Sequence, residues 1–112
     1  MQTAMLSNKG LSKEEKCARE LVVLNRSGLH ARVSVMIAQR CKDFVSDVRL
    51  YKGRVVADCR SVLDILSLGA SIGTKLRLEA VGEDAEDIVN LISDMFEARF
   101  NEDEDSETKV HV

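Results

Sequence analysis

The chain has 112 residues, of which 45% are hydrophobic and 31% are charged, and its formal net charge is −3. This length fits one small domain with a modest core, and its apolar runs are too short to span a membrane. The N-terminus lacks the charged start, apolar stretch and small-residue cleavage site of a secretory signal. We therefore expect a cytoplasmic protein without membrane insertion.

Negative charge is concentrated near the C-terminus. Residues 102–112 hold five carboxylates against one lysine, so the rest of the chain is close to neutral. Such a run predicts an acidic disordered tail over residues 102–112. Residues 1–16 contain few large apolar side chains and predict a flexible leader, which leaves residues 17–101 for the folded domain. With four aromatic residues and no basic stripe, we expect no nucleic-acid partner.

The first predicted elements are a strand and a helix. The apolar run Leu21–Leu24 predicts a strand that starts near Ala18, and the cluster Asn25–Gly28 predicts a turn. Beyond the turn, apolar residues recur at three- and four-residue spacing, which predicts an amphipathic helix over residues 31–43.

Three further strands and two further helices are predicted, separated by turns and capping residues. A hairpin, a short helix, a half-buried strand and a last helix are predicted, in that order, over residues 45–58, 62–68, 75–80 and 85–99. The hydroxyl of Ser61 is placed to cap the short helix, and Asp84 is placed to cap the last one. The order β-α-β-β-α-β-α predicts an α+β domain, with a sheet covered by helices on one face.

The three cysteines, Cys17, Cys41 and Cys59, are widely spaced and include no C-x-x-C pair. An odd number of this kind does not predict a disulfide framework or a zinc site. We expect reduced, buried thiols. A redox role is the alternative, and the sequence contains nothing that favours it.

His30 is the principal candidate for chemistry. It lies in Gly28-Leu29-His30-Ala31-Arg32, where a tight turn leads into a predicted helix. The first N–H groups of a helix lack internal partners and attract anions such as phosphate. The same field favours a neutral, nucleophilic imidazole, and Arg32 is placed to bind phosphoryl oxygens. The alternative is that His30 is a cap or packing residue and Arg32 a solvated charge.

Other kinds of site are not indicated. His111, in the acidic tail, is the second of two histidines, and His30 lacks Cys or His neighbours at metal-ligand spacing. No phosphate-binding loop of the Gly-Lys-Ser/Thr type and no nucleophile elbow is present. We expect no metal and no cofactor.

Three motifs together resemble those of the histidine-containing phosphocarrier (HPr) family of the bacterial phosphoenolpyruvate-dependent phosphotransferase system. Residues 24–37 resemble its active-site segment, and Cys59–Leu63 with Leu66–Ala70 resembles its second motif. Gly82–Ala85 resembles the entry to its last helix. The resemblance covers approximately residues 18–102 and implies an open-faced β-sandwich, in which a four-stranded antiparallel sheet is covered on one face by three helices.

The resemblance also implies a function. His30 would accept a phosphoryl group on Nδ1, Arg32 would stabilise its charge, and the backbone of Ala31 and Arg32 would bind the phosphate. The donor would be enzyme I, and the acceptor an enzyme IIA component or a regulatory protein. Such a phosphoprotein acts in sugar transport as a carrier in a relay, is not a free-standing catalyst, and is expected to be a monomer.

A docking surface and a regulatory position follow from the same resemblance. The docking surface would include Leu29, Val62, Leu63 and Leu66, for which core packing is the alternative role. Ser61 matches a serine that a dedicated HPr kinase phosphorylates in some members, and a plain helix cap is its alternative role.

Two positions depart from the family pattern. Val33 stands where proline is usual, which restores an N–H and loosens the first turn of the helix. Asp64 stands where glycine is common, which adds a charge near the docking surface. These departures leave open a regulatory HPr-like binding module outside sugar uptake. A third alternative is a small-ligand-binding or structural α+β domain in which His30 is incidental.

Overall fold

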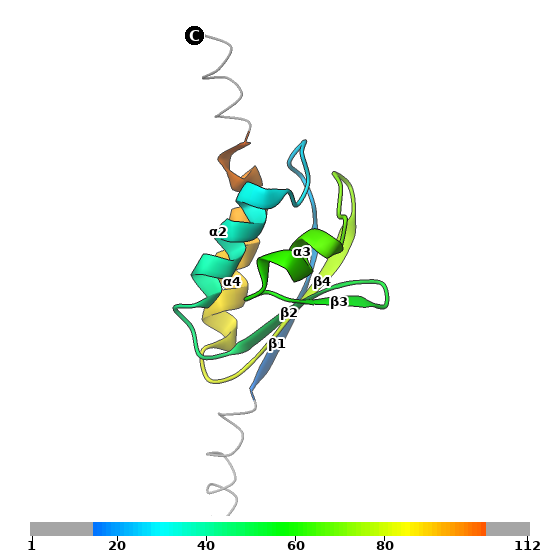
Figure 1. Cartoon of the computed structure of the whole chain (residues 1–112). Coiled ribbons are helices and arrows are strands. Elements are labelled where there is room, and N and C mark those ends of the chain that lie inside the picture. The colour runs from blue at the N-terminus through cyan, green and yellow to red at the C-terminus, as the bar shows by residue number, and fades with distance from the viewer. Residues whose placement is uncertain (1–14, 103–112) are drawn as a thin grey trace, which may run out of the picture.

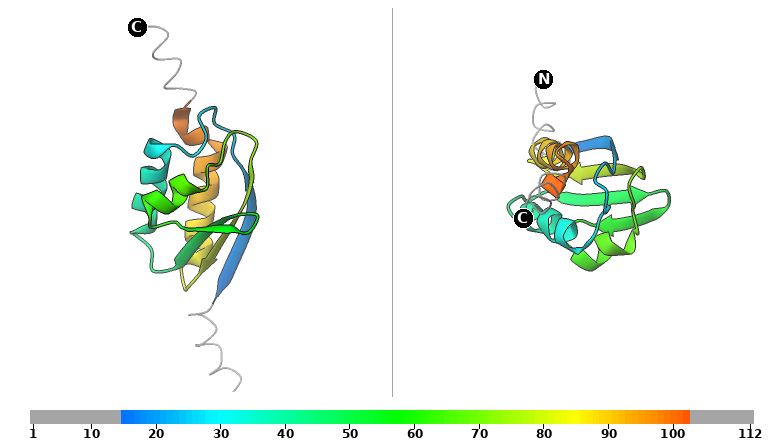
Figure 2. Two further views of the ribbon diagram at one scale, coloured as in Figure 1. Left: turned by 45° about the vertical axis from the view of Figure 1, so that its right-hand side comes forward. Right: turned by 90° about the horizontal axis from the view of Figure 1, so that it is seen from above.

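A four-stranded antiparallel sheet carries its helices on one face (Figures 1 and 2). The computed structural model describes residues 15–102. In chain order its elements are β1 (Lys16–Val22), α2 (Ala31–Cys41), β2 (Asp47–Lys52), β3 (Val55–Asp58), α3 (Val62–Ser67), β4 (Lys75–Val81), α4 (Ala85–Glu97) and a short turn, η1 (Arg99–Asn101). The order of strands in the sheet is β1-β4-β2-β3. The predicted element order and α+β class are confirmed.

The sheet has one apolar and one solvated face. Along β4, Leu76, Leu78 and Ala80 are buried while the residues between them are more exposed, as the alternating pattern predicts. β4 pairs with both β1 and β2, so its apolar side lies at the centre of the core. The other face carries charged side chains such as Arg77 and Glu79, and none of the helices within residues 15–102 covers it (Figure 2).

Helices α2 and α4 supply the other half of the core. The buried positions of α4 include Ile88, Ile92 and Phe96. Leu91 and Met95 are only partly buried, at the edge of the core. Among residues 15–102, no helix has the length and apolar character needed to cross a bilayer.

Asp84 has a different role from the predicted cap. It occupies the N-cap position of α4 but makes no side-chain capping hydrogen bond. Its carboxylate instead accepts hydrogen bonds from the backbone N–H groups of Val45 and Ser46, at 2.9 and 3.0 Å, and from the Ser46 hydroxyl. Burial opposes ionisation, but these hydrogen bonds lower the pKa of Asp84 below its usual range. Asp84 is thus the N-cap residue of α4, but the prediction that it caps the helix with its side chain is wrong, because its carboxylate binds donors from the loop before β2 instead.

The cysteines are reduced. Cys41 and Cys59 are fully buried, and Cys17 is partly buried. A hydrogen bond with Cys41 and burial raise the pKa of the Cys59 thiol well above its usual range. A protonated, enclosed thiol of this kind is a poor nucleophile, in agreement with a packing role.

Both ends of the domain differ slightly from the predicted boundaries. Lys16, assigned to the leader, is the first residue of β1, where it pairs with Val81. The last helix ends at Glu97, two residues before its predicted end, because the chain then turns into left-handed backbone. Residues 1–14 and 103–112, which make up most of the expected leader and tail, lie outside the described residues.

Candidate functional site

A tight turn between β1 and α2 positions His30. Gly28 has a φ of +70°, and a Cβ at this position would lie 2.5 Å from the carbonyl oxygen of Ala70. The next residue, Leu29, donates its N–H to that same oxygen at 2.9 Å. Glycine is therefore required by both the backbone conformation and the close approach to Ala70. This contact fixes the direction in which the chain enters α2.

His30 is the N-cap residue of α2, with extended backbone at φ −86° and ψ −174°. Its carbonyl oxygen accepts the N–H of Ser34 at 2.9 Å, but its side chain makes no capping hydrogen bond. The imidazole is 32% exposed. These observations do not favour a capping role, and they leave the ring accessible at the helix start. There the N–H groups of Ala31 and Arg32 have no acceptor within the helix, so they can donate hydrogen bonds to an anion.

Arg32 extends from α2 toward the C-terminal end of the described chain. Its Nη2 lies 3.4 Å from the carbonyl oxygen of Phe100, and its Nη1 lies 3.5 Å from the sulfur of Met36. The side chain is exposed. The guanidinium is thus held on the same helical turn as His30, where it can stabilise negative charge.

Glu102 belongs to the site, although no pattern in the sequence indicates this. It was assigned to the disordered tail, yet it is only 9% exposed. Its Oε2 accepts hydrogen bonds from the N–H and hydroxyl of Ser27, at 3.0 and 2.7 Å, and its Oε1 accepts one from Asn25 Nδ2 at 2.9 Å. Oε1 also lies 3.7 Å from Nε2 of His30. The assignment of Glu102 to the tail is wrong. It is the first residue of an acidic run, and composition does not distinguish it from the acidic residues that follow.

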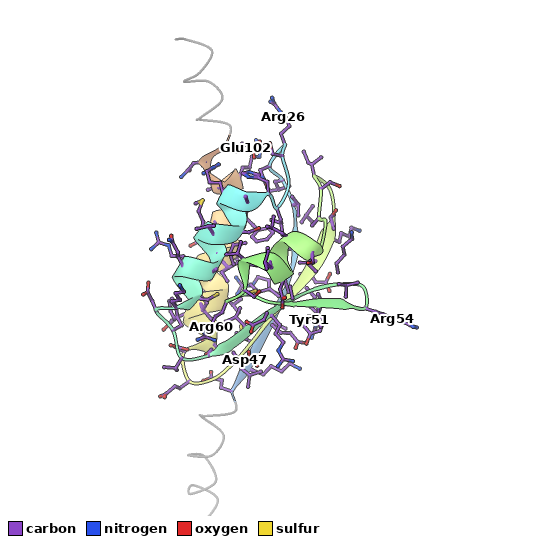
Figure 3. All side chains as sticks on the ribbon, in the orientation of Figure 1. Arg26, Asp47, Tyr51, Arg54, Arg60 and Glu102 are labelled. Carbon is purple, nitrogen blue, oxygen red and sulfur yellow. The ribbon has the colours of Figure 1, made fainter. Side chains whose placement is uncertain are left out.

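The chain returns to the site through an unusual backbone turn. Arg99, Phe100 and Asn101 all have positive φ, of 56°, 51° and 60°. Phe100 is buried, with its ring centroid 5.1 Å from that of Phe96 in an edge-to-face arrangement. This anchor brings Glu102 to the end of the molecule where α2 starts (Figure 3).

The expected docking residues divide into exposed and buried positions. Leu63 is 74% exposed and Leu66 is 36% exposed on α3, and Val62 is intermediate. Leu29 is only 5% exposed and packs in the core. The prediction that its side chain lies on the docking surface is wrong, because the Gly28 turn directs it inward.

The start of α3 has the predicted cap. The Ser61 hydroxyl accepts the N–H of Asp64 at 3.1 Å, which confirms its capping role. The Asp64 carboxylate accepts the N–H of Asp58 at 3.1 Å. Asp64 therefore stabilises the loop before α3 as well as adding charge beside it.

Val33, in the first turn of α2, is fully buried. Its side chain therefore contributes to the core, at the position for which the resemblance implies proline. Within residues 15–102, no group of three His, Cys, Asp or Glu side chains is arranged to hold a metal ion.

The fold and site together define an open-faced α+β sandwich with an accessible histidine at a helix start. The family model described as "PTS HPr component phosphorylation site" matches residues 17–98. The phosphocarrier protein HPr of Xylella fastidiosa is 41% identical over 85 residues, which cover 75% of this chain and 94% of that protein. The phosphocarrier protein NPr of Shewanella violacea is 30% identical, with 78% and 96% covered.

A solved structure agrees with these relatives. The crystal structure of HPr from Thermoanaerobacter tengcongensis superposes with a TM-score of 0.74 at 30% identity, and the match covers 77% of this chain and 97% of that one. The chain belongs to the HPr family of phosphocarrier proteins of the phosphotransferase system.

Proposed function

We propose that this chain is a cytoplasmic phosphocarrier that accepts a phosphoryl group on His30 from enzyme I and passes it to an enzyme IIA component or a regulatory target. The observation that carries the proposal is the accessible imidazole at the start of α2, with Arg32 two residues further along. Family membership supports the same role.

The geometry supplies what a carrier needs. The imidazole is the nucleophile, and the first N–H groups of α2 and the Arg32 guanidinium are placed to stabilise the charge of the transferred group. Phosphoryl transfer requires mainly positioning and charge stabilisation. Because the ring is exposed, both the donor and the acceptor can reach it in turn.

The proposal is tested by incubating the chain with enzyme I and phosphoenolpyruvate that carries a labelled phosphoryl group. We expect one labelled site per chain, with the acid-labile and alkali-stable behaviour of a phosphohistidine. Adding an enzyme IIA component should then discharge the label. If several cognate enzymes I transfer no label to the folded chain, the proposal is wrong.

The docking surface proposed for these partners consists of Val62, Leu63 and Leu66 on α3. Leu63 is largely exposed, whereas Ile65 on the other side of the helix is fully buried. Helix α3 also packs against α2, which carries the site. An exposed leucine on a helix that packs against α2 favours contact with a partner over a role in folding.

The variant Leu63→Ser should raise the KM for transfer from enzyme I by about fivefold, because losing one apolar interface contact costs about 1 kcal/mol. Its melting temperature should change little, since the side chain is exposed. Val45→Ser is the matched control, because Val45 is 70% exposed in the loop before β2, where its N–H binds Asp84 at the start of α4. Equal KM values for the two variants and the parent would contradict this assignment.

We also propose that Ser61 is a regulatory phosphorylation site for an HPr kinase, a property that favours the alternative function of a regulatory binding module. Its hydroxyl lies at the start of α3 beside the exposed docking residues. A phosphate there would add about −1.5 to −2 charges to the docking surface.

Incubation with an HPr kinase and ATP should therefore label the parent chain and leave Ser61→Ala unlabelled. The variant should retain labelling by enzyme I, although loss of the cap should cost about 1 kcal/mol of stability. A Ser61→Ala chain that the kinase labels as strongly as the parent would exclude this site.

A further inference from the structure

The carboxylate of Glu102 is fixed more firmly than an exposed tail residue would be. Three hydrogen bonds, two from Ser27 and one from Asn25, reach its two oxygens. The bonds from Ser27 and Asn25 hold the pKa of Glu102 below its usual range. The carboxylate is therefore ionised near neutral pH and has a defined position.

Asn25 shows how specific this arrangement is. Its amide nitrogen donates to Gly28 O at 2.8 Å and to Glu102 Oε1 at 2.9 Å. Its Oδ1 is buried and accepts no hydrogen bond from residues 15–102. Rotating the amide would turn Oδ1 toward two other oxygens, so the observed orientation is the favourable one. An unpaired carbonyl is tolerated here so that both amide N–H groups can be used.

The backbone before Glu102 is also held in an unfavourable conformation. Left-handed backbone costs roughly 1–2 kcal/mol per residue for most side chains, whereas asparagine tolerates it better. Arg99 and Phe100 adopt this backbone before Glu102, together with Asn101. Strained backbone persists where surrounding contacts determine it, and it is concentrated at functional sites. Here the packing of the buried Phe100 ring holds the turn in this conformation. Because of this turn, Glu102 lies beside His30.

The contact with His30 is directed at one ring nitrogen. Glu102 Oε1 lies 3.7 Å from Nε2, and the two side chains are 12% and 32% exposed. A neutral imidazole carries its proton on one nitrogen, and a neighbouring carboxylate favours the proton on the nitrogen that faces it. Glu102 thus favours the Nε2–H form, in which Nδ1 keeps its lone pair.

We propose that Glu102 is a positioning residue that holds the proton of His30 on Nε2, directs phosphorylation to Nδ1 and stabilises the phosphorylated ring. The proposal rests on the proposed phosphocarrier function. In the transfer step, the Nδ1 lone pair forms the bond to phosphorus while the bond between phosphorus and the donor breaks, and its electron pair leaves with the donor. The ring keeps the Nε2 proton and becomes positively charged, and Glu102 then forms an ion pair with it.

The substitution Glu102→Gln separates this role from a merely structural one. Keeping the two Ser27 hydrogen bonds requires the amide oxygen at the Oε2 position, which turns the NH₂ group toward His30 Nε2. The same NH₂ group then faces Asn25 Nδ2, so the hydrogen bond from Asn25 is lost. A donor at that position favours a lone pair on Nε2 and a proton on Nδ1. The variant therefore reverses the preferred form of the ring while keeping the connection to Ser27.

The experiment uses the full chain and ¹⁵N NMR of His30 at a fixed neutral pH. In the parent, the shifts should report mainly the Nε2–H form, and in Glu102→Gln mainly the Nδ1–H form. The rate of labelling by enzyme I should fall about tenfold or more in kcat, with little change in KM, because the wrong ring nitrogen carries the proton. Glu97→Gln is the matched control, since Glu97 is exposed at the end of α4 and its loss removes the same charge. It should leave both readouts unchanged.

The outcomes are distinct from those of the proposed function. If Glu102→Gln leaves the ring form and kcat unchanged and lowers only the melting temperature, Glu102 is a structural connection and the proposal is overturned. Because NMR of the unphosphorylated chain does not require enzyme I, failure of all labelling would reject the phosphocarrier function without affecting that readout. A parent chain with the proton mainly on Nδ1 would also overturn the proposal.

Discussion

Replacing His30 with alanine should abolish transfer of the phosphoryl group from enzyme I to this chain. The imidazole is the nucleophile at the start of α2, and alanine has no atom that can take its place. The fold should persist, because the His30 side chain makes no capping hydrogen bond and is not part of the apolar core. The measurement is label incorporated per chain, with the melting temperature recorded for each variant.

The chain offers a matched control for this experiment. His111 is the other of its two histidines, so His111→Ala removes the same chemical group at a different place. It should be labelled as strongly as the parent. If His30→Ala is folded and retains the label, or if His111→Ala loses it, the assignment of the acceptor residue is wrong.

Phe100→Ala should lower the free energy of unfolding by about 3–5 kcal/mol, the usual cost of removing a fully buried phenylalanine ring. Phe100 is 1% exposed and packs edge to face on Phe96, so the substitution leaves a cavity at the end of α4. The backbone strain remains, because alanine is also disfavoured at positive φ. Denaturant unfolding measures the loss.

The same substitution should disturb the site, since the Phe100 ring anchors the turn that precedes Glu102. We expect a lower rate of labelling even under conditions in which the variant is folded. Phe44→Ala is the matched control, because Phe44 is only partly buried against the core, and its loss should cost less. A Phe100→Ala chain as stable as the parent would show that the described packing of the C-terminal turn is incorrect.

Much of the fold could be predicted because local patterns agreed with the tertiary arrangement. The alternation along β4 is a property of a strand with one buried face, and the structure buries Leu76, Leu78 and Ala80 as expected. Ser61 was identified as a cap because its hydroxyl bonds only three residues ahead. Interactions of this range are encoded in short segments, so a sequence pattern is enough to find them.

The predictions that were wrong involve contacts between distant segments. Asp84 accepts donors from residues 38 and 39 positions away, which compete with the local cap. Leu29 was expected at the surface, but the neighbouring Gly28 turn packs against Ala70 and directs it into the core. In both cases the local pattern allowed two outcomes, and long-range packing selected one.

The sequence by itself therefore determined the element order, the helix-start position of His30 and Arg32, and the family to which the motifs are similar. Only the tertiary structure placed Glu102 beside His30. Its hydrogen-bond partner Ser27 lies 75 positions earlier in the sequence. An acidic residue in an acidic run has no distinguishing local signal. Its position depends on the left-handed turn and the buried Phe100 ring, which act only once the core has formed.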